Sequence, residues 1–186
     1  AHALLIPTNT ALERGFRKIT FVSSQNLQSY MASKQDRSHH VQSFCKKLSK
    51  KFKDFNWEDD PCGDVTWNIM YKTRGGMPLI WAKFGDGKNT TLFLGGVHSD
   101  ELTPVNITFR LARYLKRNPS MYKRQSTSIV VAPLVNPDGF FKKYPTRTNG
   151  LADLNRNFLT LDWYAKFYQA KKIKHIRYFP GFFPNS

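Results

Sequence analysis

The stretch that decides the fold is Leu92-Phe93-Leu94-Gly95-Gly96-Val97-His98-Ser99-Asp100-Glu101. A run of apolar residues ends in two glycines, and a histidine and a glutamate follow three positions apart. Such a run is typical of a strand in the centre of a sheet, here expected over residues 91–97. The glycines predict a tight turn at its end. We therefore expect a strand that presents His98 and Glu101 in the turn after it.

The residues beyond this turn predict a strand–helix–strand unit. Thr103 and Pro104 are expected to open a helix, as a capping hydroxyl and a proline at the first helical position. Asn118-Pro119-Ser120 ends the helix, and residues 128–135 are again strongly apolar. Strand, helix and strand in this order predict a crossover and a parallel pair, hence an α/β fold with a mixed, largely parallel central sheet flanked by helices.

The residues before the turn contain two shorter apolar segments and one amphipathic helix. Residues 65–72 and 79–84 are expected to form strands. Residues 41–55 carry apolar side chains at helical spacing, with Ser38 as the expected N-cap. The opposite face carries five lysines: Lys46, Lys47, Lys50, Lys51 and Lys53. This face is either the solvated side of a packed helix, which is the more common case, or a surface that binds polyanions.

The composition limits the class of protein. The sequence has 40% hydrophobic residues, as folded domains do, and a formal charge of +16, which favours polyanionic partners. No segment approaches the roughly 20 apolar residues of a membrane span. Cys45 and Cys62 form either one disulfide or two buried thiols.

The pair His98 and Glu101 has the chemistry of a metal site. Zinc accepts imidazole nitrogen and carboxylate oxygen, and a spacing of three on a tight turn can bring both to one ion. The pattern alone is weak, because the sequence has 5 histidines and a histidine hydrogen-bonded to a glutamate is the ordinary alternative. Its place after a strand favours the metal, because active sites of open α/β sheets lie at the carboxyl ends of strands.

Two further motifs follow. Asn136-Pro137-Asp138-Gly139 ends the second apolar segment and is a turn sequence, expected beside the first motif. Asp153-Leu154-Asn155-Arg156-Asn157-Phe158 contains an asparagine next to an arginine. The arginine fork binds a carboxylate through two hydrogen bonds, and the amide adds a third donor. Asn155 and Arg156 are therefore candidates for binding the C-terminal carboxylate of a peptide, and surface charge is the alternative for Arg156.

Together the three motifs resemble the zinc carboxypeptidase family, the carboxypeptidase A-like metallopeptidases, over about residues 60–186. The resemblance implies a zinc-exopeptidase fold and Zn²⁺ as cofactor, with His98 and Glu101 as two of three protein ligands. It also implies that Arg147 polarises the scissile carbonyl and stabilises the oxyanion. The implied reaction is hydrolysis of a C-terminal peptide bond by zinc-activated water.

The sequence departs from the family pattern after the third motif. The family has a second histidine ligand and a glutamate as general base further along the chain. Here His175 lies in a basic segment without a preceding apolar strand, and no glutamate follows Glu101. We therefore expect residues 1–60 to be a basic extension with an amphipathic helix. Residues 61–186 are expected to be the N-terminal part of a catalytic domain that a further C-terminal polypeptide completes.

The basic composition favours an anionic substrate, such as the stem peptides of peptidoglycan, and with it a periplasmic or secreted location. Two alternatives remain open. The first is an amidase or deacylase on the same scaffold, against which the carboxylate-binding pair argues. The second is a catalytically incomplete, peptidase-like binding module, because the general base is absent. A nucleic-acid partner is the least favoured, since it rests on charge alone without a recognisable motif.

Overall fold

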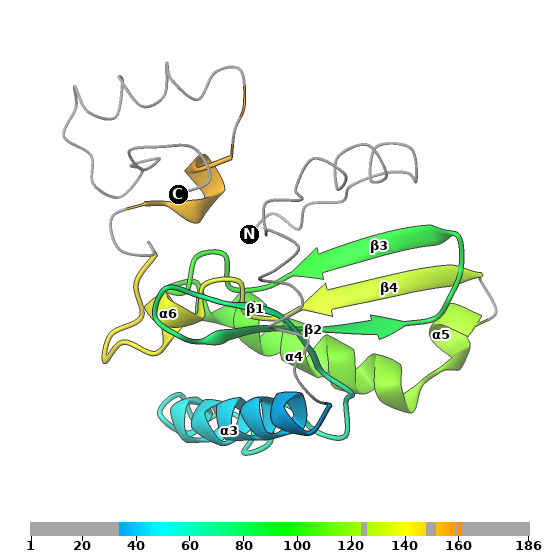
Figure 1. Cartoon of the computed structure of the whole chain (residues 1–186), viewed down its shortest axis with the longest axis horizontal. Helices are drawn as coiled ribbons and strands as arrows, with labels where there is room; N and C mark the ends of the chain where they lie inside the picture. Colours follow the sequence, from blue (N-terminus) through cyan, green and yellow to red (C-terminus); the bar gives the residue numbers. More distant parts are fainter. Residues whose placement is uncertain (1–33, 124–125, 148–151, 159, 161–186) are drawn as a thin grey trace.

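The structure is a computed structural model that describes residues 34–123, 126–147, 152–158 and 160. The sequence also predicts a short strand near residues 16–23 and a helix over residues 161–174, and both lie outside the described residues. The elements, labelled in Figure 1 except for the 3-10 helix η1, are α3 (Lys34–Lys53), β1 (Asn68–Lys72), β2 (Pro78–Phe84), β3 (Asn89–Leu94), α4 (Leu102–Arg117), α5 (Ser120–Lys123), β4 (Thr127–Ala132), α6 (Pro137–Phe140) and η1 (Leu154–Arg156). None of the helices described is both long and apolar enough to span a bilayer.

The four strands form one mixed sheet in the order β1-β2-β4-β3. β3 and β4 are parallel, with Leu92 opposite Val130, and β2 pairs with β1 and with β4 in the antiparallel direction. α4 makes the crossover between the two parallel strands, as the strand–helix–strand pattern predicted. The α/β class and the mixed sheet are thus confirmed, and β3–β4 is the parallel pair among the described strands.

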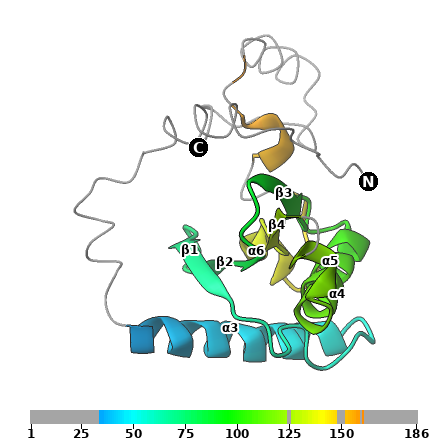
Figure 2. The same cartoon turned by 90° about the vertical axis from the view of Figure 1, so that its right-hand side faces the viewer.

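Helices α3 and α4 lie on the same face of the sheet (Figures 1 and 2). Their apolar side chains share one core with β2 and β4, because alternate residues of β2 are buried on this face. Phe52 of α3 is 1% exposed and packs edge-to-face against Trp57, Phe109 and Phe140. The helix predicted in the basic extension therefore contributes to the core of the family-like region.

A disulfide joins Cys45 on α3 to Cys62 in the segment that precedes β1. The sequence left bonded and free cysteines as alternatives, and the structure has the bond. It fastens α3 covalently to the sheet region over a separation of 17 residues. Disulfides of this kind form and persist in oxidising compartments.

Two predicted helix caps are wrong. α3 begins at Lys34, so that Ser38 lies inside the helix, because Lys34, Gln35 and Arg37 all favour helix and extend it upstream. α4 begins at Leu102 with Glu101 as its N-cap residue, and Glu101 makes no side-chain capping bond. Helix propensity sets the start of α3, and the turn before α4 sets the start of α4. A capping hydroxyl sets neither.

Candidate active site

The site lies where the parallel strands β3 and β4 end, as the strand pattern predicted. Beyond the strands the backbones stay side by side, because Val135 donates to the carbonyl of Gly95 and Asn136 to that of Gly96, both at 2.9 Å. The Ser99 hydroxyl donates to the Asn136 carbonyl at 2.5 Å. The turn that carries His98 is thereby held against the start of the second motif.

The two glycines of the turn permit this close packing. Gly96 has φ of +59°, a conformation that side chains strongly disfavour. A Cβ atom at Gly95 would collide with the hydroxyl of Thr108 and would lie 2.5 Å from the carbonyl oxygen of Pro133. β3 consequently ends at Leu94, before the expected Val97, and the chain turns towards the site.

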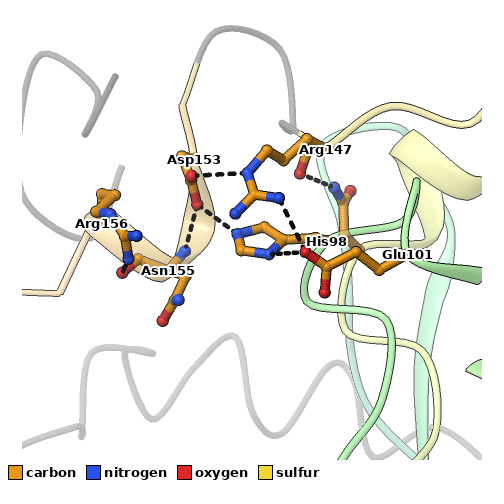
Figure 3. A network of polar contacts seen from close by, with 7 residues as sticks. His98, Glu101, Arg147, Asp153, Asn155 and Arg156 are labelled. Carbon is orange, nitrogen blue, oxygen red and sulfur yellow. Dashed lines mark hydrogen bonds and ion pairs between the residues drawn. The ribbon is translucent and has the colours of Figure 1, made fainter. Parts of the chain in front are cut away.

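His98 is held between two carboxylates (Figure 3). Its Nε2 lies 2.8 Å from Oδ1 of Asp153, and its Nδ1 lies 3.2 Å from Oε1 of Glu101. The imidazole is 7% exposed, and Asp153 is fully buried. The contact with Asp153 fixes the ring, so that Nδ1 is the nitrogen turned towards Glu101.

This arrangement fits a cation between His98 and Glu101. A carboxylate only accepts hydrogen bonds, and a neutral imidazole has a single N–H to donate. If Nε2–H is donated to Asp153, Nδ1 faces Glu101 with a lone pair, and the two acceptors together favour a positive charge. An imidazole nitrogen and a carboxylate oxygen are zinc ligands, and a metal-binding histidine ordinarily donates its other N–H to a carboxylate.

Arg147 joins the same two carboxylates. Its Nη1 donates to Oε1 of Glu101 at 2.9 Å, and its Nε donates to Oδ2 of Asp153 at 3.2 Å. The side-chain amide of Asn136 also donates to the backbone carbonyl of Arg147 at 3.3 Å. Arg147 therefore supplies positive charge beside His98 from a loop that is tied to the end of β4.

These contacts shift two pKa values. Burial by itself raises the pKa of Glu101, but the hydrogen bond from Arg147, the contact with His98 and the charge of Arg147 outweigh it, so that the pKa lies below its ordinary value. Burial by itself lowers the pKa of Arg147, but the hydrogen bond to Glu101 and the charge of Asp153 leave it raised. Both shifts favour the charged forms of the pair.

The predicted carboxylate-binding residues lie on η1. Asp153 caps this short helix by accepting from the backbone N–H of Asn155 at 2.9 Å, and the Asn155 side chain is exposed. Arg156 donates from Nη1 to the carbonyl of Asn155 at 3.0 Å and lies across Asp153 from His98 in Figure 3. The structure thus brings His98, Glu101 and Arg147 into one network and places Asn155 and Arg156 beside it.

Two buried residues received no catalytic or positioning role from the sequence. Asp153 stands in the third motif, and an acidic residue just before a short helix was the available signal. Asn136 is 1% exposed, and its Oδ1 accepts from the N–H of Gly139 at 3.0 Å while its amide and carbonyl hold Arg147 and Ser99. The second motif therefore forms the short helix α6, where a turn was expected, and it supports the wall of the site.

Removing the charge of Asp153 should destabilise the protein. Asp153→Asn removes the buried negative charge and leaves one acceptor oxygen where the His98 ring and the half-buried Arg147 guanidinium each had one, and breaking a buried ion pair costs about 3 kcal/mol or more. Urea unfolding at pH 7 measures the loss, with Asp100→Asn, at an exposed position in the same turn, as the matched control. Equal stability of the two variants would contradict the role of Asp153.

The contribution of Glu101 to stability should fade in acid. Its pKa is lower in the folded chain than the ordinary value of 4.5, so its contribution is complete above that value and is lost as the pH falls through the folded-state pKa. The difference in free energy of unfolding between wild type and Glu101→Gln should therefore shrink between pH 6 and pH 3. If this difference in free energy of unfolding grew as the pH fell, the prediction would be contradicted.

Within the residues described, no three histidine, cysteine, aspartate or glutamate side chains form a complete metal site. The assignment of His98 and Glu101 as zinc ligands therefore stays a prediction.

Comparisons with known proteins agree with this geometry. The model of the zinc carboxypeptidase family, peptidase M14, matches residues 64–178. The fold is similar to a chain in the structure of bovine thrombin-activatable fibrinolysis inhibitor in complex with tick carboxypeptidase inhibitor, with a TM-score of 0.55 and 19% identity over 80% of this chain. The match spans 50% of that chain. No curated protein matches by sequence at a significant level. The family match covers more than half of the residues, and the chain belongs to the zinc carboxypeptidase family.

Proposed function

We propose that the chain is the N-terminal portion of a zinc-dependent carboxypeptidase that removes a residue from the C-terminus of a peptide. The observation that carries this proposal is the row Asp153–His98–Glu101, in which a buried carboxylate fixes an imidazole against a second carboxylate. The chemistry that zinc would supply there is activation of a water molecule and polarisation of the scissile carbonyl. His98 and Glu101 would hold the ion, and a third ligand and a general base would come from another part of the enzyme.

The remaining residues would orient the substrate. Asn155 and Arg156 would bind the terminal carboxylate through the amide and the planar guanidinium. Arg147 would stabilise the negative charge that develops on the carbonyl oxygen of the scissile bond. Its guanidinium lies within hydrogen-bond distance of Glu101, which would hold the zinc ion. Support comes from Asp153, whose Oδ2 accepts from the Arg147 guanidinium and whose Oδ1 accepts from the backbone N–H of Asn155.

The finer substrate assignment rests on charge. A formal charge of +16 favours an anionic substrate, and we propose the acidic stem peptides of peptidoglycan. The Cys45–Cys62 bond fits a periplasmic or secreted location. If the enzyme cleaved neutral peptides well and did not cleave these acidic peptides, the substrate assignment would be refuted, while the carboxypeptidase proposal would stand.

Zinc binding tests the metal-binding pair directly. We expect the chain to bind Zn²⁺ weakly through two donors, and Glu101→Gln or His98→Ala to abolish binding. Asp153→Asn should weaken it by about 10- to 100-fold, because the partner that orients the ligand is lost. Isothermal titration calorimetry measures the affinity, with Asp86→Asn, an exposed acid paired with Lys83, as the control. Unchanged affinity in Glu101→Gln would refute the site.

Carboxypeptidase specificity tests the second half of the proposal. In a polypeptide that contains the complete catalytic domain, a peptide with a free C-terminal carboxylate should be cleaved and its C-terminal amide should not. Arg156→Ala should lower kcat/KM for the free acid by about 10- to 100-fold, since a hydrogen bond to a charged group is lost. Arg117→Ala, at an exposed position on α4, is the control.

Two other outcomes identify the alternatives. Equal cleavage of the acid and the amide would favour an amidase or endopeptidase on this scaffold. Tight peptide binding without hydrolysis would favour a binding module, which the incomplete ligand set among the described residues supports.

A further inference from the structure

A lysine-rich surface is assembled from two segments that are far apart in the sequence. Lys51 of α3 has a side chain that is 11% exposed, and its Nζ donates to the backbone carbonyls of Lys142 at 3.1 Å and Lys143 at 3.4 Å. This contact fastens the loop after α6 along the side of α3. The lysines of the helix and those of the loop consequently form one continuous surface.

We name this the α3 basic surface, and its members are the exposed residues Lys46, Lys47, Lys50, Lys142, Lys143 and Tyr144. Lys46 and Lys50 are four positions apart, so they stand one above the other, about 6 Å apart along the helix axis. Two of the lysine ammonium groups make cation–π contacts with aromatic rings. The Nζ of Lys47 lies 4.5 Å from the ring centre of Phe141, and that of Lys143 lies 5.6 Å from the ring centre of Tyr144.

Within the part of the chain that the structure describes, no carboxylate neutralises the charges of this surface. Among the described residues, the ion pairs of α3 are Lys51 with Asp54 and Lys53 with Asp59. In that part of the chain, Lys46, Lys47, Lys50, Lys142 and Lys143 have no carboxylate within ion-pair distance. Like charges at this spacing repel one another, and a linear polyanion relieves the repulsion and releases counterions when it binds.

Two features distinguish the kind of polyanion. Tyr144 is 76% exposed and lies beside the ammonium group of Lys143, and its ring offers a flat apolar face for the C–H face of a sugar, with a hydroxyl at its edge. The Cys45–Cys62 bond anchors α3 itself and is typical of proteins from oxidising compartments. This favours an anionic glycan over a nucleic acid as the polyanion.

We propose that the α3 basic surface binds a linear anionic polysaccharide. The lysine ammonium groups bind its carboxylate or sulfate groups, and Tyr144 packs against a sugar ring. Arg147 is four positions after Lys143, which is about 14 Å of chain at most, so a bound glycan lies near the active-site edge. The proposal goes beyond the proposed peptidase function, because it involves neither the metal ligands nor Arg156.

The test uses the full 186-residue chain and a fluorescently labelled heparin octasaccharide, with anisotropy measured from 50 to 200 mM NaCl. In the first variant Lys46, Lys50, Lys142 and Lys143 are changed to Gln. The matched control changes Lys88, Lys116, Arg117 and Lys123, which are equally exposed, and it removes the same four charges. We expect the first variant to lose affinity by at least about 10-fold and to show a shallower salt dependence, and the control to lose about 2-fold.

Tyr144→Ala should also lower the affinity several-fold without changing the salt dependence, because it removes no charge. Equal losses in the two quadruple variants would overturn the proposal, since net charge alone would then explain binding. Tighter binding of a single-stranded DNA with the same number of charges would overturn the choice of a glycan, as would no binding at 150 mM NaCl. Zinc affinity, measured on the same samples, should be unchanged in all three variants, so this proposal and the peptidase proposal fail independently.

Discussion

The buried carboxylate of Asp153 is the constraint on which the site depends. A fully buried charge is stable only when its oxygens are hydrogen-bonded and its charge is balanced. Asp153 meets this condition with the His98 ring, the Arg147 guanidinium and the backbone N–H of Asn155. The three partners come from three different segments, so satisfying one carboxylate also assembles the site. His98 is thereby presented to Glu101 through Nδ1 by an interaction across 55 positions of sequence.

The sheet supplies the place where these segments meet. Parallel pairing of β3 and β4 brings two strand ends to one edge, and the hydrogen bonds of Gly95 and Gly96 continue the pairing past the strands. The side chain of Asn136 accepts a hydrogen bond at the start of α6 and donates one to the carbonyl of Arg147. The backbone carbonyl of Asn136 accepts from the Ser99 hydroxyl. Charged and neutral contacts have separate tasks here: the neutral ones position the backbone, and the charged ones orient the reactive side chains.

Much of this architecture follows from local sequence patterns, and the remainder has clear physical reasons. The apolar run before Gly95, the crossover helix and the turn at His98 could be predicted because each is a short-range pattern. The helix starts at Ser38 and Thr103 could not, since several residues compete as caps and helix propensity decides. The role of Asp153 and the pairing of Cys45 with Cys62 depend on distances in space, which a separation along the chain does not give. The roles of Asn155 and Arg156 stay predictions, because they concern a substrate.

The hydrogen bonds from Lys51 to the loop after α6 connect the position of α3 to that of Arg147. The loop is tied at one end to α3 by two carbonyl bonds, and at the other end Arg147 is tied to Asn136, Glu101 and Asp153. Because both ends of this short loop are fixed, a shift of α3 would move the backbone between Lys143 and Arg147, and with it the guanidinium of Arg147. The disulfide that holds α3 in place therefore also supports the position of Arg147, through the contacts of Lys51 with the loop after α6.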